Sequence, residues 1–386
     1  MFQLTEEKLE QQKAIHTARE IYQQPDVWKE IFSDFQVQRK SLQQFLTSIY
    51  EKHDRVRVIF TGAGTSAYVG DALVQELGKQ NQEGIDFESI PTTDIVGNPM
   101  NYFQKNVPTI LVSFARSGNS PESVATVNLA EQLIKELYQV VITCNKDGEL
   151  AKNIVGDDNS RLVLLPEEAN DKSFAMTSSY TGMLFAAYLL FTEMDLSESQ
   201  FEKLTSNAKR LLDTITDKIE DILTVEFDRI VYLGSGIFSQ LSKEASLKML
   251  ELTAGKVVTM SESSLGFRHG PKSTLNETSI VVLFMSKDSY TRKYDVDILK
   301  ELSADGTKVV VLTEESNEEL ESLAEWVIAV DAIESDFLLS LLYIIFAQGV
   351  ALKKSLQLGI TPDNPSPDGR VNRVVKGVTI YPWNEQ

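Results

Sequence analysis

The chain has 386 residues, enough for two domains of ordinary size, and 42% of them are hydrophobic, which supports a large core. Its net charge of −19 argues against nucleic acid or an anionic membrane surface as a partner. The single cysteine, Cys144, excludes an internal disulfide and suits a reducing cytoplasm.

Residues 5–52 are predicted to be helical, because apolar residues recur at helical spacing among Glu, Gln and Lys, with a break at Pro25. The first residues are charged and polar, unlike a signal peptide, so we expect a cytoplasmic protein. We assign residues 1–50 to N-terminal helices that pack on the outside of a domain or on a partner subunit.

Strands and helices alternate in the next part of the chain, which we assign to one domain at 51–195. Short apolar runs predict strands at 56–60, 85–90, 107–114, 139–144 and 161–166. Helices are predicted at 67–79, 121–136 and 178–191. This order is typical of a parallel sheet covered by helices on both faces.

The second half repeats this pattern after a linker at 196–225 that contains a predicted helix, 197–223. The sequence RIVYLGSG mirrors VRVIFTGAG, so that Gly234 and Gly236 match Gly62 and Gly64. Further strands are predicted at 256–260, 279–285, 308–313 and 326–330, and helices at 237–254 and 335–357. We therefore predict an α/β fold with two duplicated, doubly wound parallel sheets flanked by helices. The second domain is assigned to 226–360, and a C-terminal tail at 361–386 is expected to fold over the site.

The longest apolar run, Phe337–Leu352, is too short to span a bilayer and contains Ser340 and Gln348. We expect it to form a buried helix, and we expect no membrane partner.

Two loops of the first half have the composition of a phosphate site. One follows the first strand, and the other follows the third strand and opens a helix at Pro121 with Ser120 as N-cap. Backbone N–H groups at helix starts, several hydroxyls and one guanidinium suit a phosphate monoester. The alternative for the second loop is an ordinary polar loop with a helix cap. The candidate residues are Gly64, Thr65, Ser66, Arg116, Ser117 and Ser120.

Nucleotide motifs fit less well. GAGTSA matches the dinucleotide pattern G-x-G-x-x-A, and Glu88 lies on the next strand. A dinucleotide site, however, needs neither the second serine-rich loop nor a doubled core, and the Gly-Lys-Ser/Thr of a P-loop is absent. A small phosphorylated metabolite is the favoured ligand. In the second half Ile237 and Phe238 replace Thr65 and Ser66, so we expect only the first half to hold phosphate.

The second half carries the candidate proton-transfer groups. Lys248 and Glu251 would share one face of a helix, and His269 precedes a Gly-Pro turn. A carboxylate, an ammonium group and an imidazole are the usual groups for proton transfer near neutral pH. The alternative is an ordinary solvated helix pair. Since His16 and His53 share no ligand spacing with His269, we expect no metal, and we expect no other cofactor.

These motifs resemble those of the SIS family, the sugar-isomerase domains that bind phosphosugars, and the resemblance covers about residues 40–380. GAGTS and SFARSGNSPES are similar to the phosphate loops of its first domain. KMLEL followed by HGP is similar to the catalytic helix and loop of the isomerase half of glucosamine-6-phosphate synthase. LGFRHGPKS, SYTRKYDVDIL and NPSPDGRVNRVV resemble the AgaS type, the tagatose-6-phosphate ketose/aldose isomerases and galactosamine-6-phosphate deaminases.

The resemblance implies roles for single residues. Its phosphate contacts would be Ser66, Ser117 and Ser120, and Thr177 is a further candidate for substrate binding. Two departures from the synthase lie beside them: Ala115 stands where the synthase has serine, and Arg116 where it has glutamine. The sequence also holds no counterpart of the synthase's glutaminase domain, so we expect no use of glutamine as an amine source.

For the chemistry, the resemblance implies that Glu251 moves a proton between C1 and C2. His269 would open the sugar ring, reaching in from a second subunit, although two extra residues separate it from the glutamate. Lys248 and Lys376 would fall on the two active-site lysines of the synthase. We expect Lys248 to stabilise the developing oxygen charge.

The expected reaction converts galactosamine 6-phosphate to tagatose 6-phosphate and ammonia through an enediol or enolamine, in a homodimer or higher homo-oligomer with shared active sites. An isomerase without deamination shares the enediol-type step, so the residues leave that alternative open, as well as a galacto or gluco sugar. A further alternative is a non-catalytic sugar-phosphate sensor, although the first 50 residues show no basic recognition helix.

Overall fold

The structure is a computed structural model that describes residues 1–80, 82–192, 196–375 and 377–384. The chain forms two compact units, each built around one parallel sheet. The β1–β5 unit comprises Asp26–Asp171, Ser178–Asp195 and Gly369–Gln386. The β6–β10 unit comprises Met1–Pro25, Lys172–Thr177 and Leu196–Asp368.

The sheet of the β1–β5 unit has the strand order β2-β1-β3-β4-β5, and every pair is parallel. Its strands are β1 (Val56–Thr61), β2 (Ile85–Ser89), β3 (Thr109–Ala115), β4 (Leu137–Thr143) and β5 (Ser160–Leu164). All residues of β1 and β3 are buried, since helices cover both faces of the sheet. The five predicted strands are thereby confirmed, with ends that shift by one or two residues.

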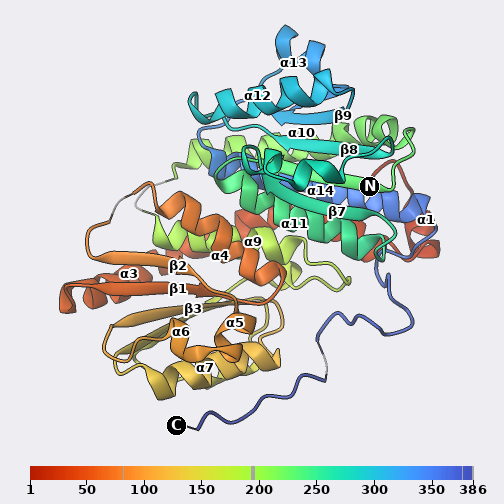
Figure 1. Cartoon of the computed structure of the whole chain (residues 1–386). Helices are drawn as coiled ribbons and strands as arrows, with labels where there is room; N and C mark the ends of the chain where they lie inside the picture. The colour runs from red at the N-terminus through yellow and green to blue at the C-terminus, as the bar shows by residue number, and fades with distance from the viewer. Residues whose placement is uncertain (81, 193–195, 376, 385–386) are drawn as a thin grey trace. The chain divides into compact units, whose positions relative to one another are not determined.

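The helices of this unit pack in two layers. One face of the sheet carries α4 and α9, and the other carries α5 and α7 (Figure 1). The bounds are α3 (Gln24–Lys52), α4 (Thr65–Leu77), α5 (Thr92–Gly97), α6 (Pro99–Tyr102), α7 (Pro121–Leu133), α8 (Glu149–Asn153), the 3₁₀ turn η1 (Glu167–Ala169) and α9 (Ser178–Phe191). Helix α9 has the predicted bounds and is buried along its whole length, which its nearly all-apolar sequence requires.

The second sheet has the order β10-β9-β8-β6-β7, the same order as the first when its strands are counted within the unit. Its strands are β6 (Arg229–Gly234), β7 (Val258–Ser263), β8 (Ser279–Phe284), β9 (Lys308–Thr313) and β10 (Trp326–Ala329). The edge strand β7 begins two residues later than predicted and runs on to Ser263, because Gly255 and Lys256 complete the turn after the preceding helix.

The helices of the β6–β10 unit again form two layers. Helices α11 and α14 lie on one face of the sheet and α12 on the other (Figure 1). The bounds are α1 (Glu6–Gln11), α2 (Ile15–Tyr22), α10 (Glu198–Leu223), α11 (Ile237–Leu252), η2 (Gly266–Arg268), η3 (Pro271–Thr274), α12 (Thr291–Ala304), α13 (Glu318–Leu323) and α14 (Asp336–Gln357). Helix α14 is long and apolar enough to cross a membrane, but 89% of its apolar window is buried inside the protein, as in a core helix.

The duplication extends to backbone angles. Gly64 has φ 57° and ψ −127° at the start of α4, and Gly236 has φ 59° and ψ −125° at the start of α11. A Cβ on Gly62 would lie 2.6 Å from the Ser66 backbone, and one on Gly234 would lie 2.5 Å from the Phe238 Cβ. Both helices therefore begin equally close to the preceding strand, and only glycine fits there.

Candidate functional site

The two serine-containing loops lie at one edge of the first sheet. They follow β1 and β3, which are parallel neighbours, so both loops leave the carboxyl ends of adjacent strands. Helices α4 and α7 start directly after them, at Thr65 and Pro121. Two helix N-termini at the carboxyl edge of a doubly wound sheet are a favourable place for an anion.

The loop after β1 is closely held. Thr65 and Ser66 are both buried, and the Ser66 N–H donates to the Ala63 carbonyl at 3.2 Å. Glu88, the acidic residue that a dinucleotide site would use for a ribose, instead accepts hydrogen bonds of 2.6 and 2.9 Å from the Arg57 guanidinium. Because Glu88 is bound to Arg57, the main argument for a dinucleotide-binding site no longer applies.

The loop after β3 is supported by the loop after β4. The Asn145 side-chain amide donates to the Ser117 carbonyl at 2.8 Å, and the Asn119 side-chain oxygen accepts from the Glu149 N–H at 2.9 Å. Gly118 has φ 67° and lies directly against Gly148, where a side chain would be crowded. The Ser117 hydroxyl is therefore presented on a loop whose backbone is fixed.

Ser120 is the N-cap residue of α7, as predicted, but its side chain makes no capping hydrogen bond. Its hydroxyl instead donates to the Ser123 hydroxyl at 2.6 Å. The Ser120 side chain therefore accepts no hydrogen bond from the N–H groups in the first turn of α7. This favours a phosphate-binding loop over an ordinary polar loop with a helix cap.

Arg116 is only 6% exposed, and its guanidinium donates to the backbone carbonyl of Arg373 at 2.8 Å. The Arg373 guanidinium in turn donates to the Asp171 carbonyl. Asp171 accepts from the N–H groups of Ser178 and Ser179 at the start of α9. The C-terminal tail is thus tied to the serine-rich loop through Arg116. The predicted site residue Lys376 lies outside the described residues.

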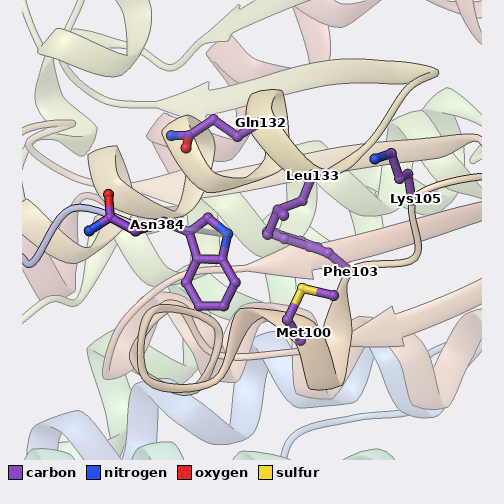
Figure 2. Close-up of a pocket in the computed structure, with 7 residues that line it drawn as sticks. Met100, Phe103, Lys105, Gln132, Leu133 and Asn384 are labelled. Atoms are coloured by element: carbon purple, nitrogen blue, oxygen red, sulfur yellow. The ribbon is translucent and has the colours of Figure 1, made fainter. Parts of the chain in front are cut away.

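The same tail ends in a cavity of about 640 Å³ at the opposite end of α7 from the serine-rich loop. Figure 2 shows Gln132 and Leu133 from the last turn of α7, with Met100, Phe103, Lys105 and Asn384 around them. Trp383 also lines this cavity and packs against the core cluster between α7 and the sheet. Among the described residues, none of the predicted site residues lines this cavity, which the end of the tail borders.

Helix α11 carries three charged side chains on one face: Glu244, Lys248 and Glu251. The Lys248 Nζ lies 2.5 Å from Glu251 Oε2 and 3.4 Å from Glu244 Oε1. Glu244 and Lys248 are fully buried, whereas the Glu251 side chain is 23% exposed. Glu251 is therefore the member of the group that a small molecule can reach, and the solvated-pair reading does not hold.

The charge state of this group follows from its surroundings. Burial lowers the pKa of Lys248, but the negative charges of Glu244 and Glu251 outweigh burial, so the pKa is raised overall. Lys248 is therefore an ammonium ion at neutral pH. The Lys248 side chain has no exposed surface and pairs with Glu251, and its expected part in stabilising the developing oxygen charge stays a prediction.

His269 lies in the same unit as α11, on the loop between β7 and β8. It follows the 3₁₀ turn η2 and precedes Gly270, whose φ of 118° disfavours any other residue, and Pro271. Its N–H donates to the Gly266 carbonyl at 2.9 Å, and its side chain is exposed. The loop therefore presents the imidazole outward from a fixed backbone.

In the second unit, side chains of the protein itself occupy the loops that correspond to the phosphate loops. Ile237 and Phe238 are buried apolar residues at the start of α11. The Asp288 carboxylate accepts from the N–H groups of Tyr290 and Thr291 at the start of α12, at 3.1 and 2.8 Å. Amides that could face an anion are thus bound by a carboxylate of the chain itself, in agreement with the expectation that only the first half holds phosphate.

The structure thus groups Gly64, Thr65, Ser66, Arg116, Ser117 and Ser120 in the β1–β5 unit, and Lys248, Glu251 and His269 in the β6–β10 unit. Thr177 is fully buried and belongs to the β6–β10 unit. Glu244 was missed by sequence reasoning, although its position four residues before Lys248 on the same helix face could have revealed it. Among the described residues, no cluster of three or more His, Cys, Asp or Glu side chains could hold a metal ion.

Comparisons with known proteins agree with these observations. The family model "SIS domain" matches residues 50–193 and 224–356. D-galactosamine-6-phosphate deaminase AgaS of Shewanella sp. (strain ANA-3) is 42% identical, over 98% of this chain and 95% of its own. The deaminase of the same name from Escherichia coli is 40% identical, over 95% and 96%. The crystal structure of tagatose-6-phosphate ketose/aldose isomerase from Escherichia coli has a TM-score of 0.87 at 37% identity and covers 96% of this chain and 97% of that chain.

Proposed function

Since the chain belongs to the SIS domain family, we propose that it converts galactosamine 6-phosphate and water to tagatose 6-phosphate and ammonia. The observation that carries the proposal is the identity of about 40%, over nearly the whole of both chains, to proteins named D-galactosamine-6-phosphate deaminase. The Glu244–Lys248–Glu251 group supports it, because it supplies one reachable carboxylate held by a buried ammonium ion.

The phosphate of the substrate is held by the loops after β1 and β3. Ser66, Ser117 and Ser120 supply hydroxyls, and the N-termini of α4 and α7 supply N–H groups and the positive ends of their dipoles. Arg116 adds a positive charge beside them. Because the whole chain carries a charge of −19, this local arrangement has to overcome an unfavourable overall field.

The chemistry is a proton transfer followed by hydrolysis. His269 assists opening of the sugar ring by moving the proton between O1 and O5. Glu251 takes the C2 proton of the open aldehyde, which leaves an enolamine, and returns it at C1 to give a ketimine. Water then adds to the ketimine, and ammonia leaves as the C2 carbonyl forms. Lys248 keeps Glu251 in place throughout.

A second reaction, ketose/aldose isomerisation without deamination, is favoured by the solved relative named tagatose-6-phosphate ketose/aldose isomerase, at 37% identity. It uses the same proton transfer and differs only in the substituent at C2. The protein acts in the cytoplasm, a place that suits its free, buried Cys144.

The experiment is an assay of ammonia release from galactosamine 6-phosphate, with glucosamine 6-phosphate as the matched control for the configuration at C4. We expect ammonia and tagatose 6-phosphate in equal amounts from the galacto sugar and much slower turnover of the gluco sugar. Interconversion of tagatose 6-phosphate with its aldose, without ammonia from either amino sugar, would replace the deaminase by the isomerase. Tight binding of both sugars with no turnover would leave only a sensor.

A further inference from the structure

Helix α12 holds the loop of His269 on both sides of the imidazole. On the N-terminal side, the Arg268 guanidinium donates to Glu301 at 2.6 Å and to Asp297 at 2.9 Å. On the C-terminal side, the Lys272 ammonium group pairs with the same Glu301 and, at 2.5 Å, with Asp305. Glu301 therefore binds the two cations that flank His269.

These pairs differ from an ordinary surface pair that Lys300 of the same helix makes with Glu319 of α13. The Arg268, Lys272 and Glu301 side chains are 23%, 28% and 35% exposed, whereas Lys300 and its partner Glu319 are 55% and 52% exposed. Hydrogen bonds from Lys272 and Arg268 lower the pKa of Glu301, so its charge persists at neutral pH. A shared carboxylate in a partly buried network fixes geometry in a way that an isolated exposed pair does not.

Two further contacts join the loop to α12. Phe267 is fully buried in the core cluster that contains Ile298, Leu299 and Leu302 of this helix. The Ser264 hydroxyl donates at 2.6 Å to the buried carboxylate of Asp295. From Ser264 to Lys272 the loop is thus attached to α12 at intervals, and the exposed imidazole of His269 projects between the attached residues.

Asp295 also connects this loop to the strands. It accepts from the Ser235 hydroxyl at 2.6 Å and from the Ser286 N–H at 3.0 Å, at the ends of β6 and β8. One buried carboxylate thereby joins the ends of three neighbouring strands to the start of the His269 loop. The backbone that carries the imidazole is fixed to the sheet as well as to α12.

We propose that Glu301 is a positioning residue for His269. Glu301 holds the loop through Arg268 and Lys272, so that the imidazole meets the ring oxygen of the substrate. This inference rests on the proposed role of His269 in ring opening. Ring opening needs a proton donor at hydrogen-bonding distance from O5, and a shift of about 1 Å can cost about 100-fold in rate. Glu301 itself contacts no substrate and acts only through the loop.

The test replaces Glu301 by Gln, which keeps the shape of the side chain but removes the charge that binds both cations. We expect kcat to fall about 10- to 100-fold with little change in KM, since phosphate binding is untouched. The matched control is Glu319→Gln, which breaks the pair between Lys300 of α12 and Glu319 of α13 and should leave kcat within about twofold. A wild-type kcat for Glu301→Gln would overturn the proposal.

A double-mutant cycle with His269→Ala separates positioning from general stability. If Glu301 acts through the imidazole, Glu301→Gln lowers the residual activity of His269→Ala no further. Additive losses would contradict the proposal, because Glu301 would then act without His269. Full activity of His269→Ala alone would instead remove the proposed role of His269, which is a distinguishable failure. If Glu301→Gln does not fold, Arg268→Lys, which keeps the charge but loses the fork to Glu301 and Asp297, takes its place in the same cycle.

Discussion

Ser117 is the residue on which the phosphate assignment depends most. Its loop is fixed by Asn145 and by the contact between Gly118 and Gly148, so its hydroxyl has a defined position at the edge of the sheet. The sequence predicted this residue from its neighbours, but it could not show that the next loop along the sheet holds the backbone.

We predict that Ser117→Ala raises KM for the phosphosugar about 10- to 100-fold with little change in kcat. A hydrogen bond to a charged group contributes about 1.5–3 kcal/mol, and the phosphate is held equally in the ground state and the transition state. Steady-state kinetics and inhibition by inorganic phosphate measure this. An unchanged KM together with wild-type inhibition by phosphate would remove the loop from the site.

At the scale of the element, helix α11 shows a buried charge group that its sequence only half predicted. The spacing of Lys248 and Glu251 indicates a shared face, but that spacing by itself is more typical of an ordinary solvated pair. Packing of α11 against α14, β6 and β7 decides between them, because it buries Lys248 and Glu244 and leaves only Glu251 at the surface. Burial depends on contacts between distant parts of the chain, which a local pattern does not record.

We predict that Lys248→Met destabilises the fold by about 3–5 kcal/mol, since it leaves the buried Glu244 without its cation. Chemical denaturation measures the loss. The double variant Lys248→Met with Glu244→Gln is the control, and it should recover a large part of the stability. A loss below about 1 kcal/mol in the single variant would mean that the Lys248 charge is not needed for folding.

Some of the other helices and strands were predicted from the sequence, and others were missed. Helix α9 and the inner strands β1, β3, β6 and β8 were predicted because long apolar runs can only be buried. Helices α5, α6 and α8 were missed, since six residues or fewer carry no clear period. Helix α12 was missed although it has 14 residues, because its buried face consists of Asp295 as well as Ile298, Leu299 and Leu302. In a sequence, an aspartate indicates a solvent-exposed position. The burial of Asp295 can be understood only once its three hydrogen-bond donors are known.

In the molecule as a whole, the duplication was predicted from the matching glycine loops, and the family from the serine-rich loops, KMLEL and HGP. The structure and the relatives confirm both. The division of roles between the two halves remains a proposal. The exposed position of His269 in its own unit is compatible with a site shared between subunits, for which we propose a homodimer or a higher homo-oligomer.

We predict that two strongly impaired variants, Glu251→Gln and His269→Ala, regain activity when their subunits are mixed. If each site takes one residue from each subunit, a mixed dimer contains one intact site, and an equal mixture should reach roughly a quarter of wild-type activity. Native mass spectrometry is the control for subunit exchange. Mixed dimers that form without any activity would contradict the shared site.

The proposed reaction depends above all on transfer of the C2 proton by Glu251, and Glu251→Gln tests this role. The amide keeps the size of the side chain but cannot accept a proton, so we expect kcat to fall about 10²- to 10⁴-fold with KM little changed and the fold intact. The decisive measurement is exchange of the substrate's C2 hydrogen with deuterated solvent, followed by NMR. We expect Glu251→Gln to abolish this exchange. Exchange at the wild-type rate would place the base elsewhere, with Glu262 near the end of β7 as the next carboxylate to test.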